Sequence, residues 1–424
     1  MTDWRTLDAP ALRTERDRLQ ARYDAFCARG LALDMTRGKP SPEQLRLSLP
    51  MLEHAERHYT SPSGIDCRNY GGLEGLPEAR RLFGEYLGAP AEQVIVGGAS
   101  SLAMMYDVCV RAVLFGVPGG PGPWGRRECR FLCPSPGYDR HFAICKQLGI
   151  GMIPVAMDDD GPDMESVERL VATDPSIVGM WCVPKFSNPT GAVYSDEVVG
   201  RLAAMPSAAE DFRIFWDNSY AVHAFQGEPA PLRNLLTACA EAGHPDRALM
   251  FASTAKITFA GAGVAAMAAS PANTAWNLRH MGFQTIGPDK LNQLRHVLFL
   301  RDMPTILALM REHAKILAPK FAAVQRVLGR ELGGKGIATW TDPRGGYFVS
   351  LDTLEGCAAE VIRRAGQAGV CLTPAGSTFP YKRDPRDTNI RIAPSFPSLE
   401  DIEAAMELLA ICVQLVSIDH LLAQ

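Results

Sequence analysis

The sequence predicts an α/β protein, with a large domain built on a mainly parallel sheet between helices and a smaller α+β domain beside it. Two observations support this class. Short runs rich in Val, Ile, Phe and Trp alternate with helical segments, and these runs are apolar throughout. Such runs are typical of parallel strands that helices cover on both faces. The 424 residues also exceed one average domain and suggest two or three.

The first predicted elements precede the sheet. Leu12, Leu19 and Phe26 recur near helical spacing, so we expect a helix over 8–29. Gly and Pro residues in 31–48 forbid a helix through that stretch, which predicts an extended segment and a loop.

Helices and strands then alternate, which places the large domain over 60–290. The runs that predict its strands include 92–98, 129–138, 150–157, 176–184, 212–220 and 248–256. A long helix is expected at about 288–330. The elements after it are a strand at 345–352, a helix at 355–368, a strand at 389–395 and a last helix from 399 onward. Residues 291–424 would carry this helix and form the smaller domain together with the segment 1–59.

Composition and charge exclude several classes of protein. The content of 47% hydrophobic and 21% charged residues is that of a soluble globular protein, and the net charge of -4 gives no reason to expect a nucleic-acid partner. The charged N-terminus does not resemble a secretory signal, and the longest apolar run, 259–269, is too short to cross a bilayer. Eleven scattered cysteines favour free thiols. We therefore expect a cytoplasmic protein without a membrane or nucleic-acid partner.

Two glycine patterns and one histidine pair are weak signals of other sites. GPGPWG at 120–125 and GAGVAA at 261–266 both fit dinucleotide-binding patterns weakly. GPGPWG contains prolines and precedes a strand, whereas a phosphate-binding loop follows a strand and opens a helix. His54 and His58 have the spacing of metal ligands on one helical face, yet no third ligand is obvious nearby. We expect a solvated helix face there and no metal site.

The stretch FASTAKITFAGAG, residues 251–263, sets Lys256 among small residues and hydroxyls with hardly another charge nearby. Burying an unpaired lysine is costly unless its pKa falls. Lys256 is therefore either a loop lysine in solvent or an amine kept partly uncharged so that it can attack a carbonyl. The residues at the other strand ends decide between these alternatives.

Ligands of an open parallel sheet gather at the carboxyl ends of its strands, so the residues after each predicted strand are candidates for chemistry. These residues are Gly97, Gly98, Ala99, Ser100, Ser101, Pro134, Gly137, Tyr138, Asn188, Pro189, Thr190, Gly191, Asp217, Asn218, Tyr220, Ser253 and Lys256. They supply an amide, an acid, a phenol, an amine and a hydroxyl-rich helix start. A pyridoxal phosphate site needs these groups.

The order NPTG, DNSY, STAK and NIRIAPS resembles the fold type I pyridoxal phosphate enzymes of the class I and II aminotransferase family. The stretches MTRGKPSPEQL, RNYGGLEGLPEAR and AKITFAGAGVA are similar to a divergent bacterial subgroup of aspartate aminotransferases. The resemblance covers nearly the whole chain. It implies that fold, with a mainly parallel seven-stranded sheet in the large domain. It also implies the cofactor pyridoxal 5′-phosphate and a homodimer with active sites at the subunit interface. The implied reaction moves an amino group from an amino acid, aspartate or glutamate, to a 2-oxo acid such as 2-oxoglutarate.

The resemblance also assigns roles around the cofactor ring. Lys256 would bind the cofactor aldehyde as an imine and later carry a proton between the substrate α-carbon and the cofactor. Asp217 would hold the pyridine nitrogen protonated, which makes the ring an electron sink. Asn188 and Tyr220 would hydrogen-bond the ring oxygen O3′, and Tyr138 would stack on the ring face.

The phosphate of the cofactor would lie at the start of a helix. Ala99, Ser100 and Ser101 open that helix, whose free N–H groups suit a phosphate, and Ser253 would join them. Tyr70 resembles the tyrosine that reaches the phosphate of the neighbouring subunit. If it does so here, the enzyme works as a dimer.

The substrate carboxylates would be held by basic and backbone groups. Arg391 would bind the α-carboxylate through a two-pronged contact, and Asn188 would also contact the substrate. Gly38 would bring its backbone close to the same carboxylate. Arg37 or Lys39 would face a second acid group on the substrate, with a solvated loop as the equal alternative.

One position departs from the family. Most members carry an arginine eight residues after the lysine to clamp the phosphate, whereas this chain has Val264. Three alternatives to an aminotransferase stay open: a lyase that uses the same lysine for elimination, a non-catalytic regulator that senses an effector, and a Rossmann dehydrogenase. About 30 residues before LALDMTRGKP leave no room for the winged helix that such regulators carry.

Overall fold

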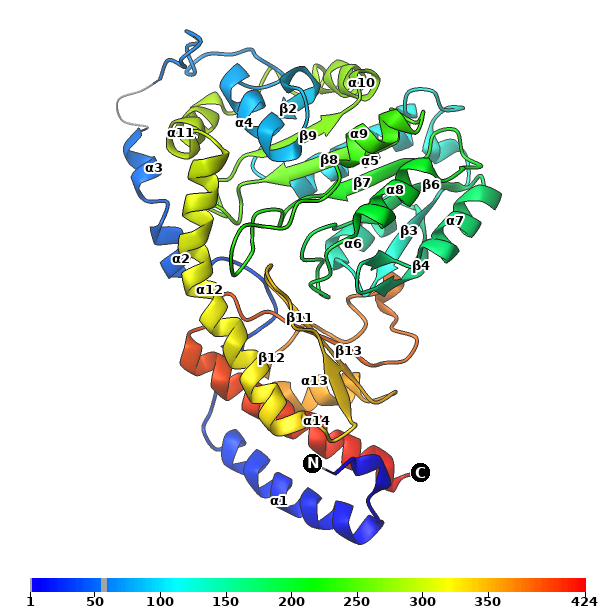
Figure 1. The fold of residues 1–424 in the computed structure, drawn as a ribbon, viewed down its shortest axis with the longest axis vertical. Coiled ribbons are helices and arrows are strands. Elements are labelled where there is room, and N and C mark those ends of the chain that lie inside the picture. The colour runs from blue at the N-terminus through cyan, green and yellow to red at the C-terminus, as the bar shows by residue number, and fades with distance from the viewer. Residues whose placement is uncertain (1, 55–58) are drawn as a thin grey trace.

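The computed structural model describes residues 2–54 and 59–424. Its helices and strands form two regions (Figure 1). The upper region in the figure holds the large sheet, and the lower region holds the short strands and both chain ends. The architecture is α/β, as predicted.

The large sheet has eight strands within the described residues, in the order β2-β9-β8-β7-β6-β3-β4-β5. Their bounds are β2 Val94–Val96, β3 Arg130–Ser135, β4 Gly151–Asp158, β5 Gly161–Pro162, β6 Ile177–Cys182, β7 Arg213–Asp217, β8 Ala248–Ser253 and β9 Ala265–Ala269. The strands from β8 to β4 pair in parallel. Strand β9 runs antiparallel to β2 and β8, and β5 runs antiparallel to β4. The sheet is therefore mainly parallel, as the apolar runs predicted.

The number of strands was predicted wrongly, as seven instead of eight. The two-residue strand β5 is too short to produce a pattern of its own. Strand β9 reads AAMAA, and alanine favours helices more than strands, so this segment gave no strand signal. It is nevertheless buried throughout, because it lies between β2 and β8.

Helices flank the strands of the large sheet. They are α4 Pro77–Leu87, α5 Ser101–Phe115, α6 Asp139–Leu148, α7 Met164–Thr173, α8 Asp196–Ala204, α9 Leu235–Glu241 and α10 Pro271–Met281. Short 3-10 helices are Trp4–Thr6, Ala91–Gln93, Trp124–Arg126 and Pro380–Lys382.

The single helix expected over 288–330 is two helices, α11 (Lys290–Leu300) and α12 (Met303–Leu332). Arg301 has a φ of 55° at the break, and the side chain of Asp302 caps the start of α12. Apolar spacing continues across this break, which is why the pattern predicted one helix. In Figure 1, α12 runs from the upper region into the lower one.

The smaller region is built on short strands and the terminal helices. Its strands are β1 Leu33–Asp34, β10 Ala338–Trp340, β11 Val349–Thr353, β12 Val370–Cys371 and β13 Asn389–Ile392. The other helices of the chain are α1 Ala9–Cys27, α2 Pro42–Arg46, α3 Pro50–Glu53, α13 Ala358–Gln367 and α14 Leu399–Leu422. β11 lies between β10 and β13 in an antiparallel sheet, and β1 pairs with β12. The stretch 31–48, expected to have no helix, thus contains α2.

Each region has its own apolar core. Ile306 and Met310, near the start of α12, belong to the core of the large region, whereas Phe321 and Leu332 belong to the second core. The domain limits 1–59, 60–290 and 291–424 stay a prediction.

Helix α14 corrects one expectation. Among the described residues it is long and apolar enough to cross a membrane, although no such segment was expected. In its most apolar window, 72% of the residues are buried inside the protein. The helix packs against α1, α12 and α13, so its apolar surface forms the core of the smaller region.

Candidate active site

The strand ends of the large sheet bring most of the predicted site residues to one edge. Asp217 is the last residue of β7, and Lys256 follows β8 after a short turn. Asn188 lies in the loop after β6, and Tyr138 precedes α6. Because β3, β6, β7 and β8 are parallel, their carboxyl ends lie at the same edge.

Lys256 is partly buried and faces an aromatic ring. Its Nζ lies 4.8 Å from the centre of the Tyr220 ring. Burial lowers the pKa of Lys256, and the negative charge of Asp217 opposes this shift only in part. The amine therefore carries a proton less firmly than a lysine in solvent does. A nucleophilic amine requires this property.

Asp217 is buried and held by two donors. His141 Nε2 lies 3.1 Å from its Oδ2, and Ser219 Oγ donates to its Oδ1 at 2.5 Å. Burial raises the pKa of Asp217, but these hydrogen bonds and the charge of Lys256 outweigh burial, so the pKa lies below its usual value. The carboxylate stays ionised at neutral pH.

His141 was missed by the sequence analysis. Its ring stacks on Trp181 with a centroid distance of 4.4 Å, and the edge of Tyr138 packs on it at 4.9 Å. The signal available in the sequence was the spacing in GYDRH, which places the histidine one helical turn after Tyr138. Burial raises the pKa of Tyr138, so its phenol is neutral.

Arg391 lies on β13 and points at residues of the large region. Its Nη1 donates to Asp139 Oδ1 at 2.7 Å and to Asn188 Oδ1 at 3.4 Å, and its Nη2 donates to Thr373 Oγ1 at 3.3 Å. The guanidinium lies 5.1 Å from the ring centre of Phe348. Its Nε is buried without a partner in the described part of the chain. Arg391 and Asn188, both predicted to bind the substrate, lie in contact, whereas Asp139 and Thr373 were not among the predicted site residues.

The N-terminal segment approaches the same place. A Cβ on Gly38 would lie 2.5 Å from Cζ of Phe348, the ring below Arg391, so only glycine permits this approach. Lys39 places its Nζ 3.8 Å from the ring centre of Phe396. Arg37 is exposed, and its guanidinium makes no hydrogen bond or ion pair within residues 2–54 and 59–424. The Arg37 guanidinium is thus free to bind a ligand.

The start of α5 forms the corner predicted for the phosphate. Ser100 is the N-cap, and its side chain makes no capping hydrogen bond to the described residues. The first N–H groups of a helix have no partner within the helix, so they remain available to an anion. Ser101, the first residue of α5, and Ser253, the last residue of β8, are both buried. Gly263 closes the corner, because a Cβ there would lie 3.2 Å from the carbonyl oxygen of Ala99.

Val264 occupies the position of the expected arginine. Its side chain is buried in the large core, and its backbone N–H donates to Thr254 Oγ1 at 2.9 Å. A cation at this position would enter an apolar core. Tyr70, the other residue predicted at the phosphate, is 82% exposed. Its exposure is compatible with contact to another subunit.

These residues fit pyridoxal phosphate. The site offers a buried acid that stays ionised, an amine with a lowered pKa, and a helix start with an uncapped hydroxyl. The unpartnered Nε of Arg391 supplies a donor that a carboxylate can use. The sequence predicted a solvated helix face for His54 and His58. His58 lies outside the described residues, so that expectation stays a prediction.

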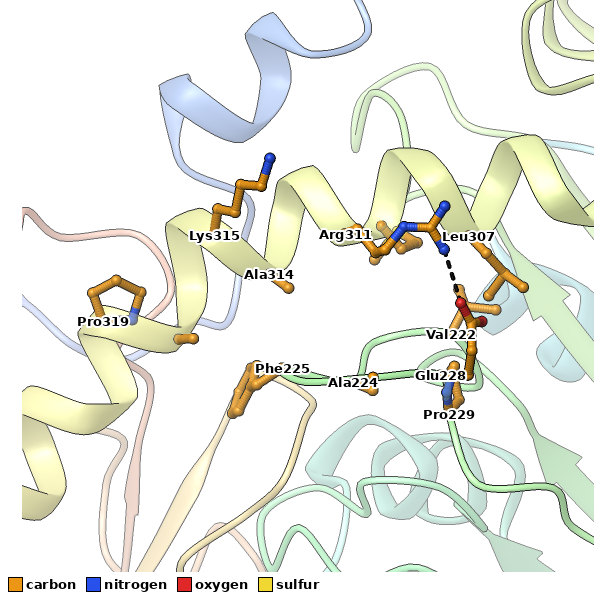
Figure 2. Close-up of a pocket in the computed structure, with 13 residues that line it drawn as sticks. Val222, Ala224, Phe225, Glu228, Pro229, Leu307, Arg311, Ala314, Lys315 and Pro319 are labelled. Atoms are coloured by element: carbon orange, nitrogen blue, oxygen red, sulfur yellow. Dashed lines mark hydrogen bonds and ion pairs between the residues drawn. The ribbon is translucent and has the colours of Figure 1, made fainter.

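A separate pocket of about 320 Å³ lies between α12 and the loop before α9. Figure 2 shows Arg311 on α12 pointing at Glu228, with which it forms a 2.8 Å ion pair. The other walls are mostly apolar, and Phe225 and Leu307 lie among them. None of the predicted site residues lines this pocket, so it is distinct from the candidate active site.

Comparison with known proteins assigns the chain to a family. Residues 7–424 match the family described as aspartate amino-transferase. A protein of Mycolicibacterium smegmatis named "Putative aminotransferase" is 50% identical to this chain, and the match covers 99% of each of the two chains. An aspartate aminotransferase of Corynebacterium glutamicum is 44% identical over 97% of this chain and 96% of its own.

A solved structure supports the same assignment. The crystal structure of an aspartate transaminase from Corynebacterium glutamicum matches with a TM-score of 0.97 and 43% identity, over 99% of both chains. More distant aminotransferase structures share the fold, among them one from Thermus thermophilus with a TM-score of 0.74 and 21% identity. The chain therefore belongs to the aspartate aminotransferase family and is an aminotransferase of fold type I.

Proposed function

We propose that this aminotransferase moves the amino group of aspartate or glutamate to a 2-oxo acid such as 2-oxoglutarate, with pyridoxal 5′-phosphate held on Lys256. The observation that carries the proposal is the environment of Lys256, whose pKa is lowered by burial beside Tyr220 and near ionised Asp217. The choice of aspartate is supported by the 44% identical relative that is named an aspartate aminotransferase.

Lys256 would perform the proton transfer. When bound, the cofactor supplies a conjugated ring that accepts the electrons left behind by loss of the α-proton. Lys256 Nζ, once released from the cofactor, is basic enough to take that proton and close enough to the ring of Tyr220 to stay positioned. Its lowered pKa favours the neutral amine more than in a lysine exposed to solvent.

Asp217 would bind the pyridine nitrogen. Its low pKa means that it remains an anion, which favours a protonated nitrogen as its partner. His141 and Ser219 already fix both carboxylate oxygens. The carboxylate therefore has one orientation when the ring arrives.

Arg391 and its neighbours would hold the α-carboxylate of the substrate. A guanidinium offers two parallel donors to a carboxylate, and burial strengthens such a contact. Asn188 lies 3.4 Å from the same guanidinium and supplies an amide at the end of the carboxylate. Arg37 is the proposed partner of the second acid group, because its guanidinium is exposed and unpaired within the described residues.

Ala99, Ser100, Ser101 and Ser253 would hold the phosphate together with the first N–H groups of α5. A second subunit would complete this corner through its own Tyr70. The tyrosine shares its exposed surroundings with Phe283 and Ile286, which are 90% and 65% exposed.

The placement of this exposed apolar group supports a homodimer. Gly287, next to Ile286, lies so close to Gly71 that a Cβ there would be 2.7 Å from its carbonyl oxygen. The exposed side chains of Tyr70 and Ile286 thus belong to neighbouring backbone segments. Exposed apolar groups of this size usually mark a contact with another chain.

We also propose a cytoplasmic location. All eleven cysteines lie within the described residues and are free thiols, which suits a reducing compartment. Fractionation of cells that express the protein tests this proposal.

The decisive experiment for the activity traps the cofactor chemically. Borohydride reduction of the enzyme loaded with pyridoxal phosphate should leave a stable label that maps to Lys256, and Lys256→Ala should leave the protein unlabelled. Addition of aspartate or glutamate without an acceptor should then convert the absorbance to that of the pyridoxamine form. Release of pyruvate and ammonia instead would show a lyase, and a label on another residue would refute the proposal.

A further inference from the structure

The peptide of Lys256 is held by side chains from outside its own loop. His223 Nε2 lies 3.2 Å from the carbonyl oxygen of Lys256, and the Tyr347 hydroxyl lies 3.5 Å from the same oxygen. His313 Nε2 lies 3.0 Å from the carbonyl oxygen of Ile257. These contacts come from three separate parts of the chain, so the backbone that carries the amine is fixed by tertiary structure.

Gln44 joins two of these three supports. Its Nε2 lies 3.0 Å from His313 Nδ1 and 2.9 Å from the Tyr347 hydroxyl. Its Oε1 accepts from the backbone N–H of Ser41 at 3.0 Å. Gln44, Ser41, His313 and Tyr347 are all fully buried. Both N–H groups and the oxygen of the amide are therefore used, and the amide has one orientation.

This orientation fixes the proton positions along the network. Because Gln44 donates to Nδ1 of His313, that nitrogen is an acceptor, and the proton must sit on Nε2, which donates to Ile257. Burial lowers the pKa of His313 to about 4, so the ring is neutral at working pH. Tyr347 accepts from Gln44 and donates to Lys256, and burial raises its pKa. No member carries a charge that could titrate near neutral pH.

Gln44 also belongs to the segment that reaches the substrate. It lies in α2, whose start is a capping box formed by Ser41 and Gln44. Gly38, just before this helix, contacts Phe348, which follows Tyr347 in the chain. The N-terminal segment thus touches the support of the catalytic lysine on one side and the ring below Arg391 on the other.

We propose that Gln44 is a positioning residue that holds the Lys256 peptide through His313 and Tyr347, and that the placement of the amine thereby depends on docking of the N-terminal segment. The inference rests on the proposed role of Lys256. It concerns the position of the amine relative to the substrate, because a displacement of about 1 Å is enough to slow a reaction on the order of 100-fold.

The test compares two leucine substitutions of glutamine. Gln44→Leu removes the amide and leaves His313 Nδ1 and the Tyr347 hydroxyl without this partner. Gln325→Leu is the matched control, because Gln325 also bridges α12 to a neighbouring segment, through Thr341 and Trp340, but does not contact the Lys256 loop. Gln44→Leu loses three hydrogen bonds, including the one from the Ser41 N–H, and Gln325→Leu loses two, so the free energy of unfolding is measured for both variants beside the kinetics.

Three measurements separate positioning from a general loss of stability. In Gln44→Leu, we expect kcat to fall by about tenfold or more, with a smaller change in KM, whereas Gln325→Leu keeps both within about twofold. Amide hydrogen exchange of the segment 254–259 should quicken in cofactor-free Gln44→Leu alone. The pH titration of the absorbance of the lysine-bound cofactor should shift in this variant and not in the control.

A double substitution tests the path. Tyr347→Phe removes only the hydroxyl that donates to Lys256, so it should lower kcat alone and have less additional effect in the Gln44→Leu background. If Gln44→Leu fails to fold, Gln44→Glu takes its place. A carboxylate can still accept from Ser41 but cannot donate to the Tyr347 hydroxyl, so kcat should fall here as well.

Wild-type values of kcat and of exchange at 254–259 in a folded Gln44 variant would overturn the inference. Failure of the proposed function would look different. The borohydride label of the wild-type protein would then map away from Lys256, while faster exchange at 254–259 in cofactor-free Gln44→Leu would still show that Gln44 supports this backbone.

Discussion

Replacing Asp139 with asparagine should strengthen the binding of substrate carboxylates. Asp139 Oδ1 accepts from Arg391 Nη1 at 2.7 Å, so it uses a donor of the guanidinium that we propose for the α-carboxylate. A substrate must either displace Asp139 or share the guanidinium with its negative charge. Asparagine has nearly the same shape but no charge, so both obstacles become smaller.

The contact allows an estimate of the effect. A hydrogen bond to a charged group contributes about 1.5–3 kcal/mol, whereas an exposed ion pair contributes about 0–1 kcal/mol. The side chains of Arg391 and Asp139 are 7% and 33% exposed, so their contact lies between these limits. We take about 1.4 kcal/mol as the competition that asparagine removes, which corresponds to roughly tenfold tighter binding.

The assay is a titration with maleate, a dicarboxylate without an amino group. Its dissociation constant, followed by the absorbance of the cofactor-loaded enzyme, should fall by about tenfold in Asp139→Asn, and the KM for aspartate should fall too. Asp17→Asn removes the same charge from an exposed position on α1 and should change neither value. Weaker maleate binding in Asp139→Asn would refute the reasoning, because it would show that Asp139 chiefly orients Arg391.

Three further predictions concern the same site. Arg391→Lys should raise the KM for aspartate by about 10- to 100-fold in steady-state kinetics, because an ammonium cannot copy a two-pronged contact. His141→Phe removes the 3.1 Å contact that lowers the pKa of Asp217 against the effect of burial, so the acid limb of the pH–rate profile should move to higher pH. Mixing the impaired Tyr70→Phe and Lys256→Ala chains should restore about a quarter of wild-type activity, since half of the dimers are hybrids with one intact site; no recovery would place Tyr70 outside the partner's site.

The parts of the site that follow parallel strands could be predicted from the sequence. Asp217 ends one mainly apolar run and Asn188 lies in the loop after another, and such runs identify parallel strands and therefore the edge where ligands bind. Arg391 could not be assigned in this way, because β13 is short and belongs to another sheet. Its assignment came from the motif NIRIAPS and the resemblance, not from a pattern of hydrophobicity.

The residues that support this site could not be predicted in the same way. Asp139 and His141 lie in the first turn of α6, where acidic and polar residues are common for reasons of helix capping. Gln44 and His313 meet across 269 positions of sequence, and only the packing of α2 on α12 brings them together. Local spacing contains no information about such contacts.

The replacement of arginine by Val264 changes how the chain can hold a phosphate. No side-chain cation fills the position, because Val264 is part of the apolar core and its N–H is bonded to Thr254. The start of α5 supplies a partial positive charge of about half a unit, which is less than the full charge of an arginine side chain. The nearby buried cation Lys290 donates instead to the backbone carbonyls of Tyr70 and Gly71.

Lys290 therefore fixes the loop that presents Tyr70 to solvent. If the hydroxyl of the partner subunit's Tyr70 binds the phosphate, the charge of Lys290 contributes to cofactor binding in the neighbouring site through the position of that loop. Cofactor retention in this chain would then depend on the dimer more than in a relative that clamps the phosphate with an arginine of its own subunit. The exposure of Tyr70, Phe283 and Ile286 is consistent with that dependence, because the same surface would bury the apolar side chains and complete the site.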